Sequence, residues 1–418
     1  MAQLTDDCFA FSGPLLPLEE MERLIAERVT PVAETEQVPL LQARTRVVAR
    51  DIVAPDHLPP FDNSAVDGYA VRHADLKTND DTVLPVTGRL QAGSKDNVAV
   101  QPGSAVRIFT GAPMPQGADT AFMQEDVTVE GDRVTLPSGL KKGANMRHTG
   151  EDIAKGAVAL PTGTVLDAQH IALAAALGLT QIEVRRQLRV AIFSTGDEVV
   201  EPGQTRGVSA IFDANRYLLA EMLDRLGMVV TDLGILDDDA TALSRAIKDA
   251  AITHDLVITS GGVSTGEADF VKVAVESIGK LVFWRVGIKP GRPVTMGTID
   301  GAAFVGLPGN PVAVFVTFVR VVKPLLRRLG GASPRKLTAL PVRSAFAYKK
   351  KTGRREYVRV SLRTRPNGEI EAVKHPQDGA GILTSLTQTD GLLELPEDIT
   401  KIEAGDRVGF LPYAALLD

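Results

Sequence analysis

Residues 255–270, DLVITSGGVSTGEADF, constrain the fold of this chain more than any other stretch. Residues 255–259 form a short apolar, β-branched run, which is typical of a buried strand. Glycine and hydroxyl residues follow directly, and glycine lets the backbone turn tightly while its N–H groups approach a ligand. Residues 268–278 then have helical spacing. We therefore predict a strand, a glycine loop and a helix start, which together form an anion site.

Two carboxylates, Glu267 and Asp269, lie inside this glycine loop. These carboxylates would repel a phosphate unless a cation lies between them and the phosphate. We therefore interpret the loop as a site for Mg²⁺ together with phosphate. The alternative is a strand-to-helix turn that only requires glycine.

Strand and helix patterns alternate over residues 188–330. Such alternation predicts a doubly wound, mostly parallel α/β domain whose ligands bind at the carboxyl ends of the strands. The candidate strands are residues 189–193, 228–233, 255–259, 282–286 and 303–306. The candidate helices are residues 214–226, 241–252, 268–278 and 311–329.

The rest of the chain has other patterns. Residues 14–30 and 40–48 predict two helices, and short apolar runs between prolines and glycines over residues 56–150 predict a small β-barrel-like domain. Residues 167–179 predict a helix that is apolar almost all round, and hence buried within the chain or at a subunit interface. After residue 330 β character returns, with a hairpin turn at Asn367-Gly368.

The predicted fold class is therefore multidomain α/β plus β. We expect a discontinuous N-terminal helical and linker domain (residues 1–55 and 148–182) and an inserted β domain (56–147). The α/β domain (183–329) and a C-terminal β domain (330–418) complete the expected division.

Composition excludes several classes of function. No run of 18 apolar residues is present and the N-terminus lacks the pattern of a secretion signal, so we expect a cytoplasmic protein without a membrane span. A single cysteine, Cys8, excludes an internal disulfide and a cysteine-built metal site. The net charge of −6 argues against general nucleic-acid binding. There is no Walker A loop, no GxGxxG motif, no HExxH motif and no convincing Ser–His–Asp arrangement.

Polar loops follow every predicted strand of the α/β domain, and a parallel sheet would bring them to one edge. They supply hydroxyls, glycine amides, acids and bases, which are the groups that hold a nucleotide or phosphate with Mg²⁺. Asn310 and Pro311 are expected to begin the last helix as N-cap and first helical residue. The carboxylates are Glu198, Asp238, Glu267 and Asp269, and the cations are Arg285, Lys289 and Arg292.

Three features of residues 56–152 leave alternatives open. Asp67 follows turn-forming residues, so it is either an Asx-turn residue or a site residue. Thr110 ends a predicted strand, where its hydroxyl could face a ligand. The mixed charges at Arg147, His148, Glu151 and Asp152 form either a site or a solvated hinge.

Taken together and in this order, the segments FDNSAVDGYAV, RIFTGAPMPQGAD, STGDE, ITSGGVSTGEADF, IKPGRP and LPGNPVAVFVTF resemble the molybdopterin molybdenumtransferase family. This family includes bacterial MoeA and the E domain of gephyrin. The resemblance covers almost the whole chain and is weakest after about residue 330. It implies insertion of molybdenum from molybdate into adenylylated molybdopterin, with Mg²⁺-dependent release of AMP. It also implies an elongated four-domain homodimer whose cleft joins one subunit's α/β domain to the partner's barrel domain, with the molybdopterin adenylyltransferase as a further candidate partner.

The resemblance also implies roles for individual residues, which are carried over by position in the motifs. Asp67, Thr110, Glu198, Asp238 and Asp269 match the family's catalytic positions, and Asp238, Asp269 and Glu198 are the expected Mg²⁺ ligands. The expected substrate-binding residues are Arg147, Ser260, Gly261, Gly262, Arg285, Lys289, Arg292, Pro308 and Pro311, with Glu151 and Asp152 in the same segment as Arg147.

This chain departs from the family pattern at two places. His148 and Thr149 stand where further arginine is frequent, and Arg285 stands where lysine is common. Arginine is a planar fork and not a point charge, so its contacts differ from those of lysine. Two other functions compete with the transferase: a Mg²⁺-dependent nucleotide or pyrophosphate hydrolase, and a non-catalytic scaffold.

Overall fold

The computed structural model describes residues 4–5, 7–10, 15–96, 98–261, 270–291 and 293–417. The chain forms two compact units. The larger unit contains residues 1–50, 162–167 and 182–418, and the smaller contains residues 51–161 and 168–181. In the described part of the chain, none of the helices is long and apolar enough to cross a membrane. The four-domain division stays a prediction.

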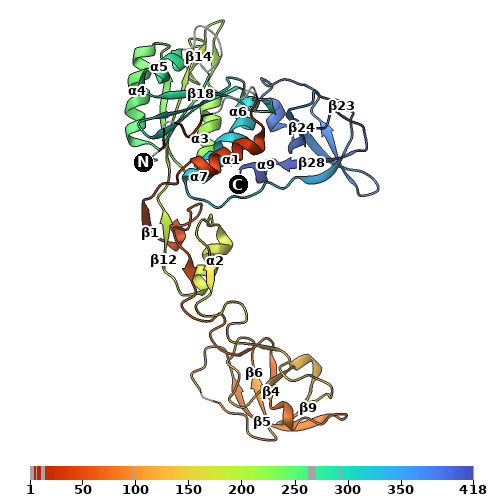
Figure 1. The fold of residues 1–418 in the computed structure, drawn as a ribbon. Helices are drawn as coiled ribbons and strands as arrows, with labels where there is room; N and C mark the ends of the chain where they lie inside the picture. The colour runs from red at the N-terminus through yellow and green to blue at the C-terminus, as the bar shows by residue number, and fades with distance from the viewer. Residues whose placement is uncertain are drawn as a thin grey trace. The chain divides into compact units, whose positions relative to one another are not determined.

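A six-stranded sheet organises the larger unit, as the alternating pattern predicts (Figure 1). β16, β13, β17 and β21 are parallel neighbours in this order, and β20 and β18 extend the sheet beyond β21 with antiparallel pairing. The strands are β13 (Arg189–Thr195), β16 (Val229–Leu236), β17 (Leu256–Ser260), β18 (Lys280–Arg285), β20 (Pro293–Ile299) and β21 (Ala302–Leu307).

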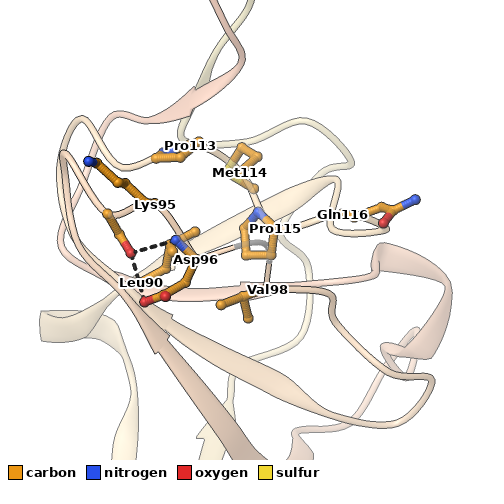
Figure 2. Close-up of a pocket in the computed structure, with 9 residues that line it drawn as sticks. Leu90, Lys95, Asp96, Val98, Pro113, Met114, Pro115 and Gln116 are labelled. Atoms are coloured by element: carbon orange, nitrogen blue, oxygen red, sulfur yellow. Dashed lines mark hydrogen bonds between the residues drawn. The ribbon is translucent and has the colours of Figure 1, made fainter.

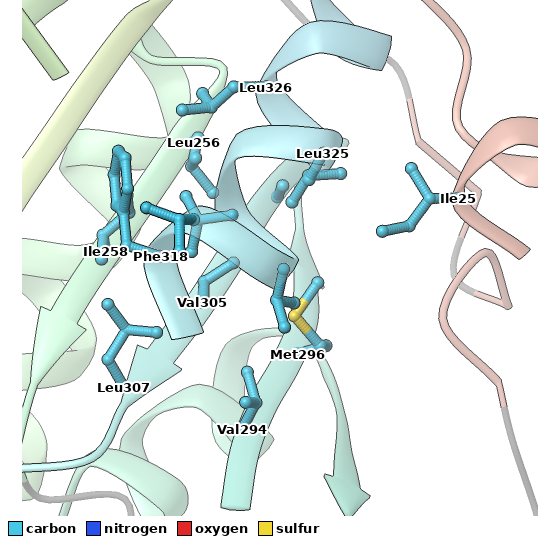
Figure 3. Packing of buried hydrophobic residues seen from close by; sticks show 14 of the residues in the cluster. Ile25, Leu256, Ile258, Val294, Met296, Val305, Leu307, Phe318, Leu325 and Leu326 are labelled. Carbon is cyan, nitrogen blue, oxygen red and sulfur yellow. The ribbon is translucent and has the colours of Figure 1, made fainter. Parts of the chain in front are cut away.

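Helices cover both faces of this sheet, because successive strand side chains point to opposite sides. α4 (Ala240–Thr253) and α5 (Phe270–Ile278) pack on one face, against Phe193, Val257 and Phe304. The other face is covered by α1 (Leu18–Arg28), α3 (Asn215–Arg225), α6 (Pro311–Thr317), a π-helical turn (Phe318–Val322) and α7 (Lys323–Leu329). Figure 3 shows part of this second core, in which Leu325 of α7 lies between Ile25 of α1 and the sheet residues Leu256, Ile258 and Val305. The doubly wound fold is thus confirmed.

The smaller unit is mostly β, which confirms the prediction for residues 56–150. Its main sheet has the order β7 (Thr120–Met123), β4 (Gly68–Val71), β6 (Ala105–Ile108), β5 (Thr82–Leu90), β9 (Arg133–Leu136) and β8 (Thr128–Glu130). Short ladders join β3 (Asn63–Ser64) to β10 (Met146–Arg147) and β2 (Ile52–Val53) to β11 (Val158–Leu160). α2 (Ala168–Ala176) belongs to the same unit.

A second six-stranded sheet forms the C-terminal part of the larger unit. Its order is β19 (Ile288–Lys289), β24 (Arg355–Thr364), β25 (Ile370–Lys374), β22 (Leu340–Ser344), β28 (Arg407–Pro412) and β26 (Gly391–Leu395), with β24 also paired to β26. The predicted hairpin is confirmed, since β24 and β25 are antiparallel around Asn367-Gly368. β19 lies in sequence between β18 and β20 of the α/β sheet, but it pairs with β24 of the C-terminal sheet, in parallel.

Two local predictions are wrong. Residues 40–48 do not form a helix: only a 3₁₀ turn, Leu40–Gln42, is present. Val47 and Val48 instead make single β-bridges to Val165 and Val184, so pairing with distant segments overrides the local apolar pattern. The predicted burial of the helix at residues 167–179 within the chain is also wrong, because among the residues of α2 only Ala174 is buried.

Candidate functional site

The carboxyl ends of four parallel strands meet at one edge of the α/β sheet. Ser194 pairs with Ser260, and Ser260 pairs with Leu307, so β13, β17 and β21 end at the same level. Thr195 of β13 pairs with Leu236 at the end of β16. The carboxyl ends of these strands therefore share one edge, which is where the sequence predicts ligand-binding loops.

In the acidic loop after β16, the neighbouring side chains Asp238 and Asp239 make different contacts. The hydroxyl of Thr195 donates a hydrogen bond to Asp238, so Asp238 is tied to the end of β13. Asp239 is the N-cap of α4, and its carboxylate accepts from the backbone N–H of Ala242 at 2.7 Å. Asp239 therefore has a structural role, and the ligand role of Asp238 stays a prediction.

Asn215 is a residue of this sheet edge that the sequence patterns do not predict. Asn215, the first residue of α3, donates from its amide to the hydroxyl of Ser260 at 2.9 Å and to the carbonyl of Gly309 at 2.7 Å. The Ser260 hydroxyl is itself 3.4 Å from the carbonyl of Pro308. Asn215 thus joins the end of β17 to the loop after β21. The available signal was its place at a helix start after a strand, but its partners are 45 and 94 residues away.

The beginnings of the two glycine-containing loops are also held by backbone contacts. The N–H of Gly261 donates to the carbonyl of Leu307 at 3.1 Å, and Gly261 has a φ of +92°, a conformation that favours glycine. Pro311 is the first residue of α6, as predicted. Asn310 occupies the N-cap position, but its side chain makes no capping hydrogen bond.

Two of the predicted cations are described, and their surroundings differ. Arg285 is the exposed last residue of β18. Lys289 is paired in register with Glu356 of β24, and its ammonium lies 3.1 Å from the Glu356 carboxylate. The loop that carries Lys289 also touches α6, since the hydroxyl of Thr317 is 3.4 Å from the carbonyl of Gly291.

A further cation, Arg359, was not predicted. Its side chain is buried and donates to the hydroxyl of Ser385 at 3.0 Å and to the carbonyl of Gly379 at 2.9 Å. No ion pair joins it to a carboxylate in the described ranges, and burial lowers the pKa of its guanidinium. The segment it binds lies at the start of α6, because the N–H of Val312 donates to the carbonyl of Ala380 at 3.0 Å.

In the smaller unit, the structure brings Asp67 and Thr110 together. One carboxylate oxygen of Asp67 accepts both the backbone N–H of Thr110, at 2.8 Å, and its hydroxyl, at 2.7 Å. These two hydrogen bonds hold the pKa of Asp67 below its ordinary value, with the charge of Arg107 as a smaller cause. The carboxylate is therefore bound by a residue 43 positions away, not by an Asx turn of its own.

A second carboxylate of the same loop is bound in the same way. Asp62 accepts the backbone N–H and the hydroxyl of Thr149, at 2.7 and 2.8 Å. His148 lies 3.8 Å from Asp62, and its backbone N–H donates to Glu151 at 2.7 Å. Arg147 pairs with Asn63 in the β10–β3 ladder and is exposed. The charge cluster at residues 147–151 is thus tied to the loop that carries Asp67.

The metal prediction is not decided by the described residues. Gly262, Glu267, Asp269 and Arg292 lie outside them, so nothing is added to those predictions. Among the residues that are described, no group of three metal-binding side chains is close enough to hold an ion. Glu198 and Asp238 follow neighbouring strands, and one or two carboxylates with waters and substrate phosphates suit Mg²⁺.

A separate hollow of about 560 Å³ lies in the smaller unit (Figure 2). Both apolar and polar side chains line it, and among them Ser94 donates a hydrogen bond to Asp96 at 2.9 Å. Neither Asp67 nor Thr110 is among its described lining residues. Those residues are Leu90, Ser94, Lys95, Asp96, Val98, Pro113, Met114, Pro115 and Gln116.

Comparison with known proteins gives consistent matches along the chain. Residues 16–178 match the model described as MoeA N-terminal region (domain I and II). Residues 191–328 match a probable molybdopterin binding domain, and residues 341–413 match the MoeA C-terminal region (domain IV).

Similar whole proteins are also found. A protein of Haemophilus influenzae named molybdopterin molybdenumtransferase is 38% identical over 407 residues, which is 96% of this chain and 100% of the relative. A protein of the same name from Nostoc is 38% identical over 90% of this chain and 88% of its own length. The crystal structure of a molybdopterin biosynthesis MoeA protein from Pyrococcus horikoshii has a TM-score of 0.78 at 30% identity, over 96% of this chain and 100% of that one.

Proposed function

The chain belongs to the molybdopterin molybdenumtransferase family, and we propose that it inserts molybdenum from molybdate into adenylylated molybdopterin with release of AMP. The observation that carries this proposal is the edge of the α/β sheet, where acidic and hydroxyl side chains from separate loops lie together. Thr195 fixes Asp238 there, and Asn215 joins Ser260 to the loop at Gly309. Relatives that are 38% identical over at least 90% of this chain carry the transferase name.

The reaction brings anions together, because molybdate is a dianion and the pterin substrate carries a pyrophosphate. We propose that Arg285, Lys289 and Arg292 hold the anionic groups, and that Arg359, which forms no direct ion pair in the described ranges, assists as a further cation. Backbone amides at Ser260–Gly262 and the loop at Pro308–Pro311 would orient the substrate.

Magnesium is part of the proposal. Glu198, Asp238 and Asp269 would hold Mg²⁺, largely through water, and Mg²⁺ on the pyrophosphate would withdraw charge from the attacked phosphorus. Asp67 and Thr110 would position a reacting group from the β unit, with Asp67 kept ionised by its two hydrogen bonds. We also propose a cytoplasmic homodimer that receives its substrate from a molybdopterin adenylyltransferase.

The test is release of AMP from adenylylated molybdopterin when molybdate and Mg²⁺ are added to the purified full chain. The transferase should release AMP only with both additions. Release without molybdate would indicate a pyrophosphate hydrolase, and no release under any condition would favour the scaffold. The Asp269→Asn variant should keep its fold and lose AMP release, and normal turnover in that variant would remove its metal role.

A further inference from the structure

Glu356 is a buried carboxylate at the boundary between the α/β sheet and the C-terminal sheet. Its side chain is only 2% exposed. β24, which carries it, pairs with β19 so that Glu356 stands directly opposite Lys289. A buried carboxylate costs much free energy unless it is paired and hydrogen-bonded, so its contacts need a reason.

The two carboxylate oxygens of Glu356 have unequal surroundings. Oε2 accepts from the ammonium of Lys289 at 3.1 Å and from the hydroxyl of Tyr348 at 3.0 Å. Oε1 lies 3.7 Å from the guanidinium of Arg354, and no hydrogen bond to it is formed in the described part of the chain. Burial, with the charge of Glu356 as the next cause, raises the pKa of Tyr348, so its hydroxyl remains a donor.

Lys289, in contrast, is about half exposed. An ammonium has three donors, and in the described residues one of them is directed to Glu356. The backbone of Lys289 is already fixed by the β19–β24 pairing and by the contact of Gly291 with Thr317. These contacts do not fix the lysine side chain, which is a flexible four-carbon chain with many rotamers.

We propose that Glu356 is a positioning residue for Lys289: with Tyr348 orienting the carboxylate, it holds the ammonium in one place so that the remaining N–H groups meet the oxyanion. This inference rests on the proposed function for the role of Lys289. Preorganised donors stabilise developing charge without reorganisation during the reaction. The Glu356 carboxylate also partly neutralises the charge of Lys289. Positioning and neutralisation therefore predict opposite changes in anion binding when Glu356 is replaced.

The test measures molybdate binding by calorimetry in the wild-type chain and in Glu356→Gln, Lys289→Ala and the double variant. A positioning residue predicts that Glu356→Gln weakens binding about tenfold, and that it adds nothing further in the Lys289→Ala background. A residue that only neutralises Lys289 predicts tighter binding in Glu356→Gln, because the amide removes the negative charge. Tighter or unchanged binding, or an equal loss without Lys289, would overturn the proposal.

Matched variants separate positioning from folding. Glu394 has a similar environment, with the hydroxyl of Tyr357 at 3.1 Å and Arg355 at 3.4 Å, but no contact with Lys289 in the described structure. Glu394→Gln should therefore leave molybdate binding within about twofold of wild type. Where Glu356→Gln does not fold, Tyr348→Phe removes one hydrogen bond only and should weaken binding about threefold. Unchanged binding in Tyr348→Phe would then count against the proposal.

Turnover gives a second readout, and it separates this inference from the proposed function. Glu356→Gln should lower kcat more than it changes KM for molybdate. If wild-type protein binds molybdate but releases no AMP, the proposed function fails while the binding comparison still decides the role of Glu356.

Discussion

At the scale of single residues, Asp67 and Thr110 form the best-defined pair of predicted site residues. Thr110→Val keeps the backbone N–H donor and removes the hydroxyl, so Asp67 loses one of its two hydrogen bonds. We expect the pKa of Asp67 to rise toward its ordinary value in this variant. We also expect turnover to fall roughly tenfold, since hydrogen bonds to charged groups are the stronger ones.

The pH dependence of this effect has a definite sign. A carboxylate whose folded pKa is lowered stabilises the fold above its unfolded pKa, near 3.9 for aspartate, and loses that contribution as the pH falls through the folded value. The stability difference between wild type and Thr110→Val should therefore be present at pH 6 and vanish in strong acid. Denaturant unfolding at a series of pH values measures it, and a difference that persists in acid would indicate lost packing instead.

Asn215 gives a second prediction at this scale. Asn215→Ala removes the amide that joins the end of β17 to the loop after β21, so the Ser260 hydroxyl and the Gly309 carbonyl each lose a hydrogen bond. We expect a loss of about 1–3 kcal/mol in unfolding free energy and a larger proportional loss of turnover. A cycle with Ser260→Ala should show coupling, because the two side chains touch. Additive effects would show that the amide acts mainly through Gly309.

At the scale of elements, much of the fold could be predicted from sequence. The alternation of strands and helices predicts β13, β16, β17, β18 and β21, because strands of a sheet that is covered on both faces are largely apolar runs. It missed β20, whose sequence PVTMGTI follows a loop and pairs antiparallel inside an otherwise parallel pattern. The apolar pattern also predicted a helix at residues 40–48 that is absent. Leu41 is 94% exposed there, and Val47 and Val48 form single β-bridges to distant residues.

The site was predictable only in part, because some of its contacts join residues that are far apart in the sequence. Loops at strand ends follow from the parallel sheet, but Asn215 and Glu356 act on partners 45 and 67 residues away. No local pattern marks such contacts. The sequence pattern around Arg359 is that of an ordinary alternating strand. In the described structure it is distinguished by its burial without a direct ion pair.

Gly68 at the start of β4 supports a prediction about one sheet. A Cβ there would lie 1.6 Å from the carbonyl oxygen of Phe122, a backbone atom of the neighbouring strand that cannot turn aside. Gly68→Ala should therefore destabilise the smaller unit by about 3 kcal/mol. The control is Gly207→Ala, which meets no atom within 4 Å and should change stability by less than about 0.5 kcal/mol.

The two units allow this loss to be localised. The only tryptophan in the sequence, Trp284, lies in the larger unit. In Gly68→Ala, far-ultraviolet circular dichroism should change at denaturant concentrations where tryptophan fluorescence is still native. Coincident transitions of the two signals, at the wild-type midpoint, would contradict both the strain and the independence of the smaller unit.

At the scale of the whole molecule, α2 supports the homodimer proposal. Its sequence is apolar almost all round, yet among its residues only Ala174 is buried in the single chain. An exposed apolar helix of this kind indicates a surface that is covered by another chain. The interface alternative for residues 167–179 thus stays a prediction, although burial within the chain is excluded.

We therefore expect a mass of twice 44.6 kDa in solution, measured by light scattering after gel filtration. A glutamate on the exposed part of α2, as in Ala172→Glu, should shift the protein toward monomer, because an unpaired charge would be buried in the interface. Lys248→Glu on the exposed side of α4 is the control and should leave the mass unchanged. A dimer that survives Ala172→Glu at micromolar concentration would place the interface elsewhere, and a monomeric wild type would remove the homodimer proposal altogether.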